Sequence, residues 1–470
     1  MIRCFLFLLL SAVAIPARQP NVVIIFTDDH GTLDAGCYGS KDLHTPAIDR
    51  LAREGVRFTQ AYAHMFCCPS RAALLTGRHP QRSGVNAWTQ GNMNSDQGVN
   101  MFLSEITLAE VLKGAGYRTA LFGKWHVGAH RDRGPTRQGF DEFFGLRGGF
   151  IDNYIHYFLQ GDGHHDLYEG TKEVWAKGEY FPEMMTERAL KFIDANQDHP
   201  FFLYLAFNTP HYPEQPRAED LKRFAHLPEP RRTYAAFLAT TDSYIDRVLK
   251  RLDTLKLRED TIIVLMGDNG HQSYESYDFF EIKVDNHASG LPKGYRFSVG
   301  DGPNPGGGNT GKWRGAKATY FEGGIRVPAI LSYPAKLPRN IVRDQAITVM
   351  DWFPTILNLC AVELPKVKID GHDLQPVIRS AKEPSPHPVL YLQWQNQWMV
   401  REGDWKLVRK KGLRPSAGQR FWLYNLADDE PEAKDYIKEK PEVAERLKRL
   451  HAAFERDVLA GQSRYWEKPD

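Results

Sequence analysis

Four short apolar stretches, each followed at once by polar residues, constrain the fold of this chain more than any other feature. They cover residues 22–26, 119–122, 201–207 and 262–266. Each is apolar throughout rather than alternating, which is typical of strands in a sheet that is covered on both faces. Amphipathic helical patterns lie between them, at residues 45–55, 108–113 and 235–255. This alternation predicts a doubly wound α/β fold whose sheet is covered by helices on both faces.

Polar side chains follow the four stretches, at the points where the predicted strands end. The carboxyl ends of parallel strands share one edge of a sheet, and ligands of open α/β sheets bind outside that edge. We therefore expect a single site there, built from Asp28, Asp29, Lys124, His126, His211, Asp268 and Asn269.

The sequence pattern changes near residue 384. Short strand-like runs follow at residues 389–392, 398–401, 405–408 and 421–424, and a helical pattern covers residues 441–459. Several short strands joined by turns are typical of an antiparallel sheet. We expect a large α/β domain at residues 20–383 and a small C-terminal α+β domain with an antiparallel sheet at residues 384–470.

The composition limits the classes of function. The 470 residues are 42% apolar and 25% charged, which is ordinary for a globular protein and excludes a disordered chain or a collagen-like fibre. The net charge of +2 predicts no whole-surface attraction to nucleic acid or to anionic membranes. Five cysteines without Cys-x-x-Cys spacing exclude a disulfide scaffold and a structural zinc site.

The first residues are typical of a secretion signal. Arg3 precedes an apolar run at residues 5–14, which closes on the small-x-small pattern Ala12-Val13-Ala14 and is too short to span a bilayer. We predict a signal peptide at residues 1–17, cleavage after Ala14 or shortly beyond, and export to the periplasm or the exterior without stable membrane insertion. The alternative is a buried N-terminal strand.

Two adjacent cysteines begin the string Cys67-Cys68-Pro69-Ser70-Arg71, which runs directly into an apolar segment ending at Gly77. Pro69 and Ser70 suit the start of a helix, which would place Cys67 just before a helix N-terminus, where the dipole favours negative charge. From these residues alone three interpretations stay open: a thiolate nucleophile, a vicinal disulfide, or two small buried side chains.

The whole string, together with residues 72–78, resembles the signature of the type I sulfatases, members of the alkaline-phosphatase-like superfamily. The resemblance implies an alkaline-phosphatase-like fold, in which helices sandwich a large mixed, mostly parallel sheet, and it implies hydrolysis of sulfate esters. It also implies that Cys67 is converted to Cα-formylglycine by a formylglycine-generating maturation enzyme. One hydroxyl of the hydrated aldehyde would attack sulfur, and the other would afterwards expel sulfate.

Two further segments match this family in chain order. Asp28-Asp29 and Gly267-Asp268-Asn269-Gly270 resemble its metal site. Three carboxylates and an amide oxygen are hard ligands that suit Ca²⁺, or alternatively Mg²⁺. Such a cation would neutralise the sulfuryl oxygens and orient the nucleophile. Taken singly, each pair is also typical of a turn at the end of a strand.

The segment Gly123-Lys124-Trp125-His126 resembles another family motif. By this resemblance Lys124 would balance the sulfate charge and hold the diol, and His126 would be the base that collapses the sulfate adduct. Arg71 would hold the diol and its neighbours.

The leaving oxygen would be contacted by His211 and Lys317. His211 closes Asn208-Thr209-Pro210-His211, and Lys317 occupies the family's lysine position before Glu-Gly-Gly. A proton or a positive charge there lowers the barrier to alkoxide departure. Asp268 is the candidate acceptor for the proton of the attacking hydroxyl. With 17 histidines in the chain, any one taken alone is more often a surface or core residue.

A sulfated oligo- or polysaccharide is the substrate that we expect for an exported enzyme of this kind. Candidate contacts are Lys312 and Arg314, which follow a glycine-rich segment at residues 290–311, together with His79 beside Arg78 and His271 directly after the proposed metal motif. Basic groups suit anionic sugars. Solvated charges and packing residues are the alternative interpretation of the same positions.

Three rival functions are compatible with the same residues. A phosphonate or phosphodiester hydrolase of the superfamily would act on a similar tetrahedral oxyanion. A non-catalytic protein that binds sulfated glycans would need no nucleophile. A cysteine hydrolase would use the unmodified thiolate of Cys67, with His126 or His211 as its base.

Overall fold

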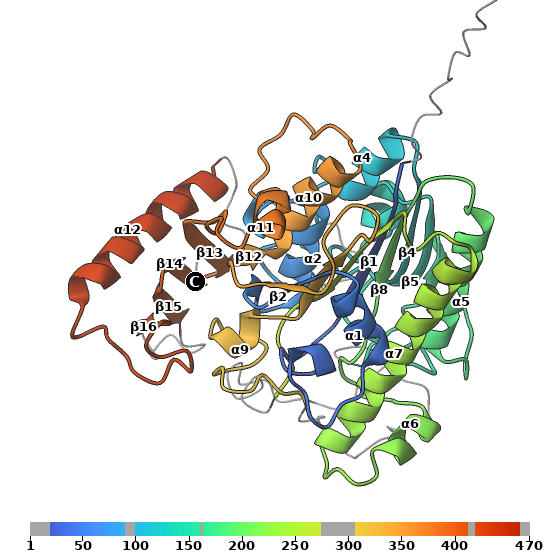
Figure 1. Cartoon of the computed structure of the whole chain (residues 1–470), viewed down its shortest axis with the longest axis horizontal. Coiled ribbons are helices and arrows are strands. Elements are labelled where there is room, and N and C mark those ends of the chain that lie inside the picture. Colours follow the sequence, from blue (N-terminus) through green and yellow to red (C-terminus); the bar gives the residue numbers. More distant parts are fainter. Residues whose placement is uncertain (1–18, 90–98, 160–162, 274–305, 412–418, 461–470) are drawn as a thin grey trace, which may run out of the picture.

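The computed structural model describes residues 19–89, 99–159, 163–273, 306–411 and 419–460 (Figure 1). The predicted signal peptide and most of the glycine-rich segment at residues 290–311 lie outside these ranges. Within the ranges, every helix is too short or too polar to cross a membrane.

A mixed sheet of ten strands, in the order β11-β2-β10-β9-β1-β8-β4-β5-β6-β7, forms the centre of the molecule. Its five middle strands run parallel, and they are β9 (Thr261–Gly267), β1 (Asn21–Thr27), β8 (Phe201–Ala206), β4 (Arg118–Lys124) and β5 (Glu142–Leu146). Four of these contain the four apolar stretches. The predicted mostly parallel sheet is therefore confirmed.

Shorter strands extend this sheet on both sides. On one side lie β10 (Ala329–Ser332), antiparallel to β9, then β2 (Val56–Phe58) and β11 (Ile341–Arg343). On the other lie the antiparallel strands β6 (Tyr168–Glu169) and β7 (Lys172–Glu173). A separate two-stranded sheet pairs β3 (Ala61–Tyr62) with β12 (Ile347–Thr348).

Helices cover both faces of the large sheet, which explains why its strands are apolar throughout. Val22, Ile24 and Phe26 of β1 face one hydrophobic core, whereas Val23 and Ile25 face the other. The first core includes α2 (Cys67–Thr76), α4 (Leu108–Gly114), α10 (Trp352–Leu359) and α11 (Gln375–Arg379). The second includes α1 (Pro46–Arg53), α5 (Phe181–Ala195) and α7 (Arg231–Thr254). The sheet therefore lies between two helical layers.

The remaining helices in the described ranges are short. They are α3 (Pro80–Ser83), α6 (Ala218–Arg223) and α9 (Glu322–Ile325), with 3₁₀ turns η1 (Gly36–Tyr38), η2 (Arg131–Arg133), η3 (Pro135–Arg137) and η4 (Val349–Asp351).

Local sequence signals account for several helix ends. Thr107 and Glu110 form a capping box at the start of α4, with hydrogen bonds of 3.1 and 2.7 Å. Gly77 ends α2 at a φ of +66°.

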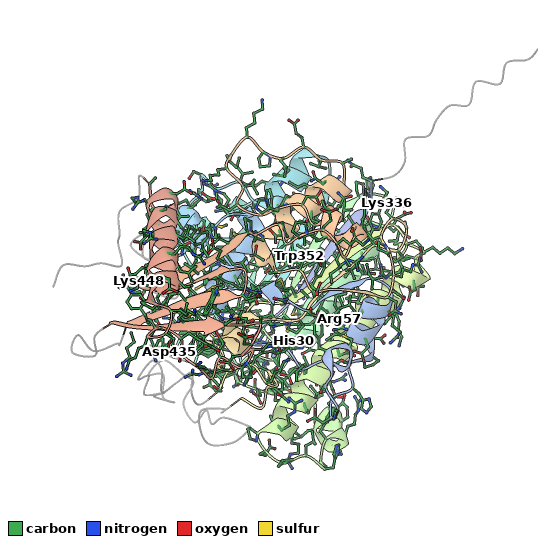
Figure 2. The ribbon with its side chains drawn as sticks, turned by 60° about the vertical axis from the view of Figure 1, so that its left-hand side comes forward. His30, Arg57, Lys336, Trp352, Asp435 and Lys448 are labelled. Atoms are coloured by element: carbon green, nitrogen blue, oxygen red, sulfur yellow. The ribbon has the colours of Figure 1, made fainter. Side chains whose placement is uncertain are left out.

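The C-terminal residues form a four-stranded antiparallel sheet and one long helix. The elements are β13 (Val389–Trp394), β14 (Gln397–Glu402), β15 (Trp405–Lys411), β16 (Gln419–Asn425) and α12 (Pro441–Val458). Figure 1 shows them beside the large sheet, on the side opposite α5 and α7. Figure 2 shows Lys448 of α12 at the periphery and Trp352 of α10 in the interior.

The two faces of the C-terminal sheet have different partners. Val400 and Leu407 pack with Leu447 of α12. Leu392 and Met399 belong instead to a core that also contains residues of the large α/β part, namely Tyr62, Met65, Phe66, Ala318, Tyr320 and Ile325. Phe66 precedes Cys67 and Ala318 follows Lys317, so this sheet packs directly behind two segments of the predicted site.

Candidate active site

The predicted site residues converge at the carboxyl edge of the parallel strands, together with the first turn of α2 and the segment before α9. All of them are buried: Asp28, Asp29, Cys67, Arg71, Lys124, His126, His211, Asp268, Asn269 and Lys317. Seven come from strand ends, as the sequence pattern predicts.

Helix α2 begins at Cys67 itself, so the expectation that Cys67 lies just before the helix is wrong by a small shift. Pro69 occupies the third helical position, where a missing backbone N–H costs no intrahelical hydrogen bond. Cys67 and Arg71 are four residues apart and therefore lie on the same side of the helix. The Ser70 hydroxyl donates to the carbonyl of Asp268 at 2.5 Å, which fixes this turn against the end of β9.

Arg71 connects α2 to three strand ends. Its Nε and Nη2 donate to Oδ2 of Asp268 at 3.1 and 2.8 Å. Nη1 donates to the carbonyl of Lys124 at 3.1 Å, and Nη2 to that of Phe207 at 3.5 Å. A fully buried guanidinium needs such partners, and here they belong to the segments that form the site.

The carboxylates of the site are paired with amino groups. Lys124 Nζ donates to Oδ2 of Asp28 at 2.5 Å. Lys317 Nζ lies 2.8 and 2.9 Å from the two carboxylate oxygens of Asp29. Burial opposes ionisation of Asp29, but the neighbouring His211 and Lys317 outweigh the effect of burial and lower the pKa of Asp29. Burial and the charge of Asp28 raise the pKa of Asp268 to about 6.

Two oxygens of this cluster have no hydrogen-bond partner among the described residues. They are Oδ1 of Asp28 and Oδ1 of Asn269, and both are buried. Asn269 Nδ2 donates to Oδ1 of Asp29 at 2.7 Å, which turns its own oxygen away from that carboxylate. Unsatisfied buried oxygens next to two further carboxylates fit a hard divalent cation.

Cys67 and His126 are in contact, with Sγ 3.1 Å from Nδ1. Burial raises the pKa of the Cys67 thiol, although Lys124 and Lys317 oppose this. Burial and the charge of Lys124 hold the pKa of His126 well below its usual value. Unmodified, the pair would therefore be a thiol and a neutral imidazole rather than the ion pair of a cysteine hydrolase. Cys67 and Cys68 are free thiols, without a vicinal disulfide.

His211 is oriented by an aromatic neighbour that the sequence analysis missed. Its ring stacks on Phe150, with 5.0 Å between centroids and 25° between planes. Its Nδ1 lies 2.6 Å from the carbonyl of Tyr212, and its Nε2 lies 3.6 Å from Oδ2 of Asp29. Phe150 follows β5, so the rule that the site lies at strand ends would have included it had this strand been predicted.

Of the four candidate substrate contacts, His271 lies beside the predicted site residues. Its carbonyl accepts a hydrogen bond from the amide of Lys317 at 2.9 Å. Its Nδ1 has no partner within the described part of the chain. Burial lowers the pKa of His271 to about 4, so the ring is neutral at ordinary pH.

The other three candidates contact the C-terminal residues. His79 packs edge-on against Phe454 of α12, with 4.7 Å between ring centroids. Lys312 forms an ion pair with Glu430. Arg314 donates to the hydroxyl of Tyr424 at 3.2 Å and to the carbonyl of Glu432 at 3.1 Å.

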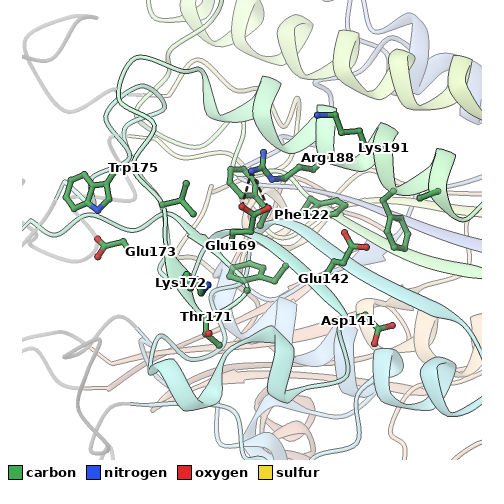
Figure 3. Close-up of a pocket in the computed structure, with 16 residues that line it drawn as sticks. Phe122, Asp141, Glu142, Glu169, Thr171, Lys172, Glu173, Trp175, Arg188 and Lys191 are labelled. Atoms are coloured by element: carbon green, nitrogen blue, oxygen red, sulfur yellow. Dashed lines mark hydrogen bonds and ion pairs between the residues drawn. The ribbon is translucent and has the colours of Figure 1, made fainter.

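A separate groove of about 1100 Å³ lies at the far edge of the large sheet, beside β7 and α5 (Figure 3). Trp175, Lys172, Arg188 and Lys191 are among its lining residues, and the predicted site residues are not. This groove is therefore distinct from the predicted site.

Comparison with known proteins shows which family this chain is similar to. A family model described as "Sulfatase" matches residues 20–362, and one described as "N-sulphoglucosamine sulphohydrolase, C-terminal" matches residues 312–458. Human arylsulfatase A is 31% identical, over 85% of this chain and 77% of its own length. Pig N-acetylgalactosamine-6-sulfatase is 31% identical, over 86% of this chain and 75% of its own length.

A solved structure is similar over most of the fold. The crystal structure of Ps i-CgsB in complex with k-i-k-neocarrahexaose has a TM-score of 0.76, 27% sequence identity and coverage of 93% of both chains. Together with the family match over most of the chain, the likeness covers both the large sheet and the C-terminal sheet. The chain therefore belongs to the sulfatase family and is an enzyme that hydrolyses sulfate esters.

Proposed function

We propose that this sulfatase is exported, carries Cα-formylglycine at position 67, binds Ca²⁺ and removes sulfate from sulfated oligo- or polysaccharides. We also propose that its large domain spans residues 20–383 and its small domain residues 384–470. The observation that carries the proposal is the position of Cys67, whose sulfur, together with carboxylate oxygens of Asp28 and Asp268, forms a cluster with mutual distances within 4.8 Å.

Each proposed group has its own task. The formylglycine hydrate would supply the oxygen that accepts the sulfuryl group and then releases it. A cation held by Asp28, Asp29, Asp268 and Asn269 would neutralise the sulfuryl oxygens. Carboxylate and amide oxygens are hard ligands that Ca²⁺ accepts in varied geometries, and Ca²⁺ is the ion that we propose.

The remaining side chains would transfer protons and stabilise negative charge on the sulfate and the leaving oxygen. Lys124 would balance the negative charge of the sulfate, and Arg71 would hold Asp268 in position against the first turn of α2. Neutral His126, 3.1 Å from the sulfur of Cys67, is placed to take a proton from the group at that position. His211 and Lys317, which both approach the carboxylate of Asp29, would stabilise the leaving oxygen.

A glycan substrate is supported by what similar proteins are named for. One relative is an N-acetylgalactosamine-6-sulfatase, and the similar crystal structure contains a neocarrahexaose. Export is supported by the charged and apolar start of the chain.

The decisive experiment is a peptide mass spectrum of the segment that contains Cys67, from protein produced with a maturation enzyme. Conversion of the thiol to the aldehyde lowers the residue mass by about 18 Da, and activity should rise in proportion to the converted fraction. Full activity in unconverted protein would overturn the nucleophile. Faster hydrolysis of phosphate diesters than of sulfate esters would overturn the preferred substrate, and binding of sulfated glycans without turnover by converted protein would overturn catalysis.

A further inference from the structure

A buried charge cluster lies between the C-terminal sheet and the segment that carries Lys317. Nζ of Lys406, on β15, lies 2.7 Å from Oε1 of Glu322 and 2.8 Å from Oε1 of Glu432. All three side chains are at most 1% exposed. Burying two carboxylates and an ammonium group carries a large desolvation cost, so such a cluster adds little to the stability of the fold. It does hold the three side chains in one fixed arrangement.

Glu322 is held from several directions at once. The hydroxyl of Tyr62 donates to its Oε2 at 2.7 Å, and Arg326 lies 3.5 Å from the same oxygen. The backbone amide of Glu322 donates to Oε2 of Glu432 at 2.6 Å. Both the side chain and the backbone of this residue are therefore fixed, at the point where α9 begins.

The segment between Lys317 and Glu322 is folded tightly on itself. The amide of Gly323 donates to the carbonyl of Arg314 at 2.7 Å. A Cβ at Gly323 would lie 2.3 Å from the carbonyl oxygen of Gly315, and one at Gly324 would lie 2.3 Å from that of Thr319. The two glycines thus permit a compact loop, in which tightly packed backbone joins Glu322 to Lys317.

The same loop contacts the proposed metal segment. The amide of Lys317 donates to the carbonyl of His271 at 2.9 Å, and the amide of Gly270 donates to the carbonyl of Gly324 at 3.0 Å. Lys317 then places its amino group on Asp29. A continuous set of contacts runs from Lys406 through Glu322 and its loop to this amino group.

We propose that Lys406 of the C-terminal sheet is a positioning residue for Lys317, and that it sets the contact of Lys317 with the leaving oxygen. This inference rests on the proposed role of Lys317 at that oxygen. Stabilisation of the leaving group matters most for poor leaving groups, because good ones depart without assistance. A mispositioned Lys317 therefore slows sugar and alkyl sulfates far more than activated aryl sulfates.

The test uses Lys406→Met in the full, converted chain, with kcat/KM measured for aryl sulfates of graded leaving-group pKa and for an alkyl sulfate. We expect a loss of about 100-fold for the alkyl sulfate but only a few-fold for 4-nitrophenyl sulfate, matching the pattern of Lys317→Ala. Lys406→Arg, which keeps the charge, should restore part of the alkyl sulfatase activity. Lys434→Met, an exposed lysine in the same C-terminal part, is the matched control and should behave as wild type.

A merely structural role predicts equal losses for all substrates, and that result would overturn the inference, as would wild-type kinetics for folded Lys406→Met. If Lys406→Met does not fold, the double variant Lys406→Met/Glu432→Gln also removes one of the two carboxylates that pair with Lys406. The same measurements are then made on this double variant. If instead Lys317→Ala shows no dependence on the leaving group, the proposed role of Lys317 fails. If the loss of kcat/KM rises steeply with leaving-group pKa for Lys317→Ala but not for Lys406→Met, the positioning role of Lys406 is refuted and the role of Lys317 is kept.

Discussion

Arg71 donates two hydrogen bonds to the same carboxylate oxygen of Asp268, from Nε at 3.1 Å and from Nη2 at 2.8 Å. The other oxygen of Asp268 accepts a hydrogen bond from the amide of Asp29 at 3.2 Å. One carboxylate thus connects α2, the end of β9 and the end of β1. Because a guanidinium offers several donors in a fixed plane, it can hold these contacts and two carbonyl contacts together.

Arg71→Lys should lower kcat/KM by about 100-fold, because an ammonium group cannot reproduce the planar set of contacts. The measurement is the rate with 4-nitrophenyl sulfate, divided by the fraction of Cys67 converted as read from the peptide mass spectrum. Thermal unfolding should still be cooperative. Wild-type kinetics in converted Arg71→Lys would show that the charge alone is sufficient.

Asp28→Asn should weaken divalent metal binding by at least tenfold while the fold is kept, because it removes the charge from a buried ligand with an unpartnered oxygen. Metal content after dialysis and calorimetric titration with Ca²⁺ report this directly. Asp42→Asn, on a carboxylate that pairs with Arg231 outside the predicted set, is the matched control. Unchanged Ca²⁺ affinity in Asp28→Asn would remove this residue from the ligand set.

Phe150→Leu should lower kcat for alkyl or sugar sulfates by about tenfold, since the His211 ring loses the surface on which it stacks. Activated aryl sulfates should be much less affected. Phe158→Leu changes the same aromatic cluster one ring further from His211 and serves as the control. Equal losses in both variants would indicate general loosening of the cluster rather than a contact with His211.

Asp242 gives a prediction for stability against pH. Its carboxylate accepts hydrogen bonds from the amides of Ala47 and Ile48 at 3.1 and 2.9 Å, yet burial raises its pKa to about 7. The folded state then binds a proton more tightly than the unfolded state, whose carboxyl titrates near pH 4. The contribution of this group to stability is therefore full below about pH 4 and is lost as pH rises through about 7.

Asp242→Asn should remove this pH dependence of the free energy of unfolding. Urea unfolding of wild type and variant between pH 4.5 and 8 measures the free energy of each, and the difference between the two cancels the other titrating groups. The variant should lose less stability than wild type across this interval. Parallel curves would mean that the two backbone donors keep the pKa of Asp242 low.

Much of the site could be predicted because its residues follow strands that are recognisable from composition. Residues 22–26 and 262–266 read as buried strands, and the carboxylates after them do lie together. The edge strands were beyond such reasoning. β2 and β11 have three residues each and mixed burial, and a run that short has no periodicity to detect.

The contacts of Lys406 and Glu432 could not be predicted for a different reason. Charged residues in sequence are usually solvated, and nothing local in residues 404–407 indicates that this lysine is buried. Its burial depends on the docking of the C-terminal sheet behind residues 317–325. Phe150 was missed because β5 was not recognised, although its sequence, Glu142–Leu146, does contain a short apolar run. The domain boundary near residue 384 stays a prediction.

Cys67 is only 2% exposed in the folded chain. Its sulfur is enclosed by groups from β1, β4, β9 and the Lys317 loop, the last of which is synthesised about 250 residues later, or roughly 10–50 s at ordinary translation rates. Any enzyme that oxidises this side chain must reach it in that interval or in an otherwise unfolded chain. If Cys67 is converted as we propose, the order of oxidation and folding during biosynthesis decides which molecules acquire the nucleophile, and a molecule that folds first would stay inactive for as long as it remains folded.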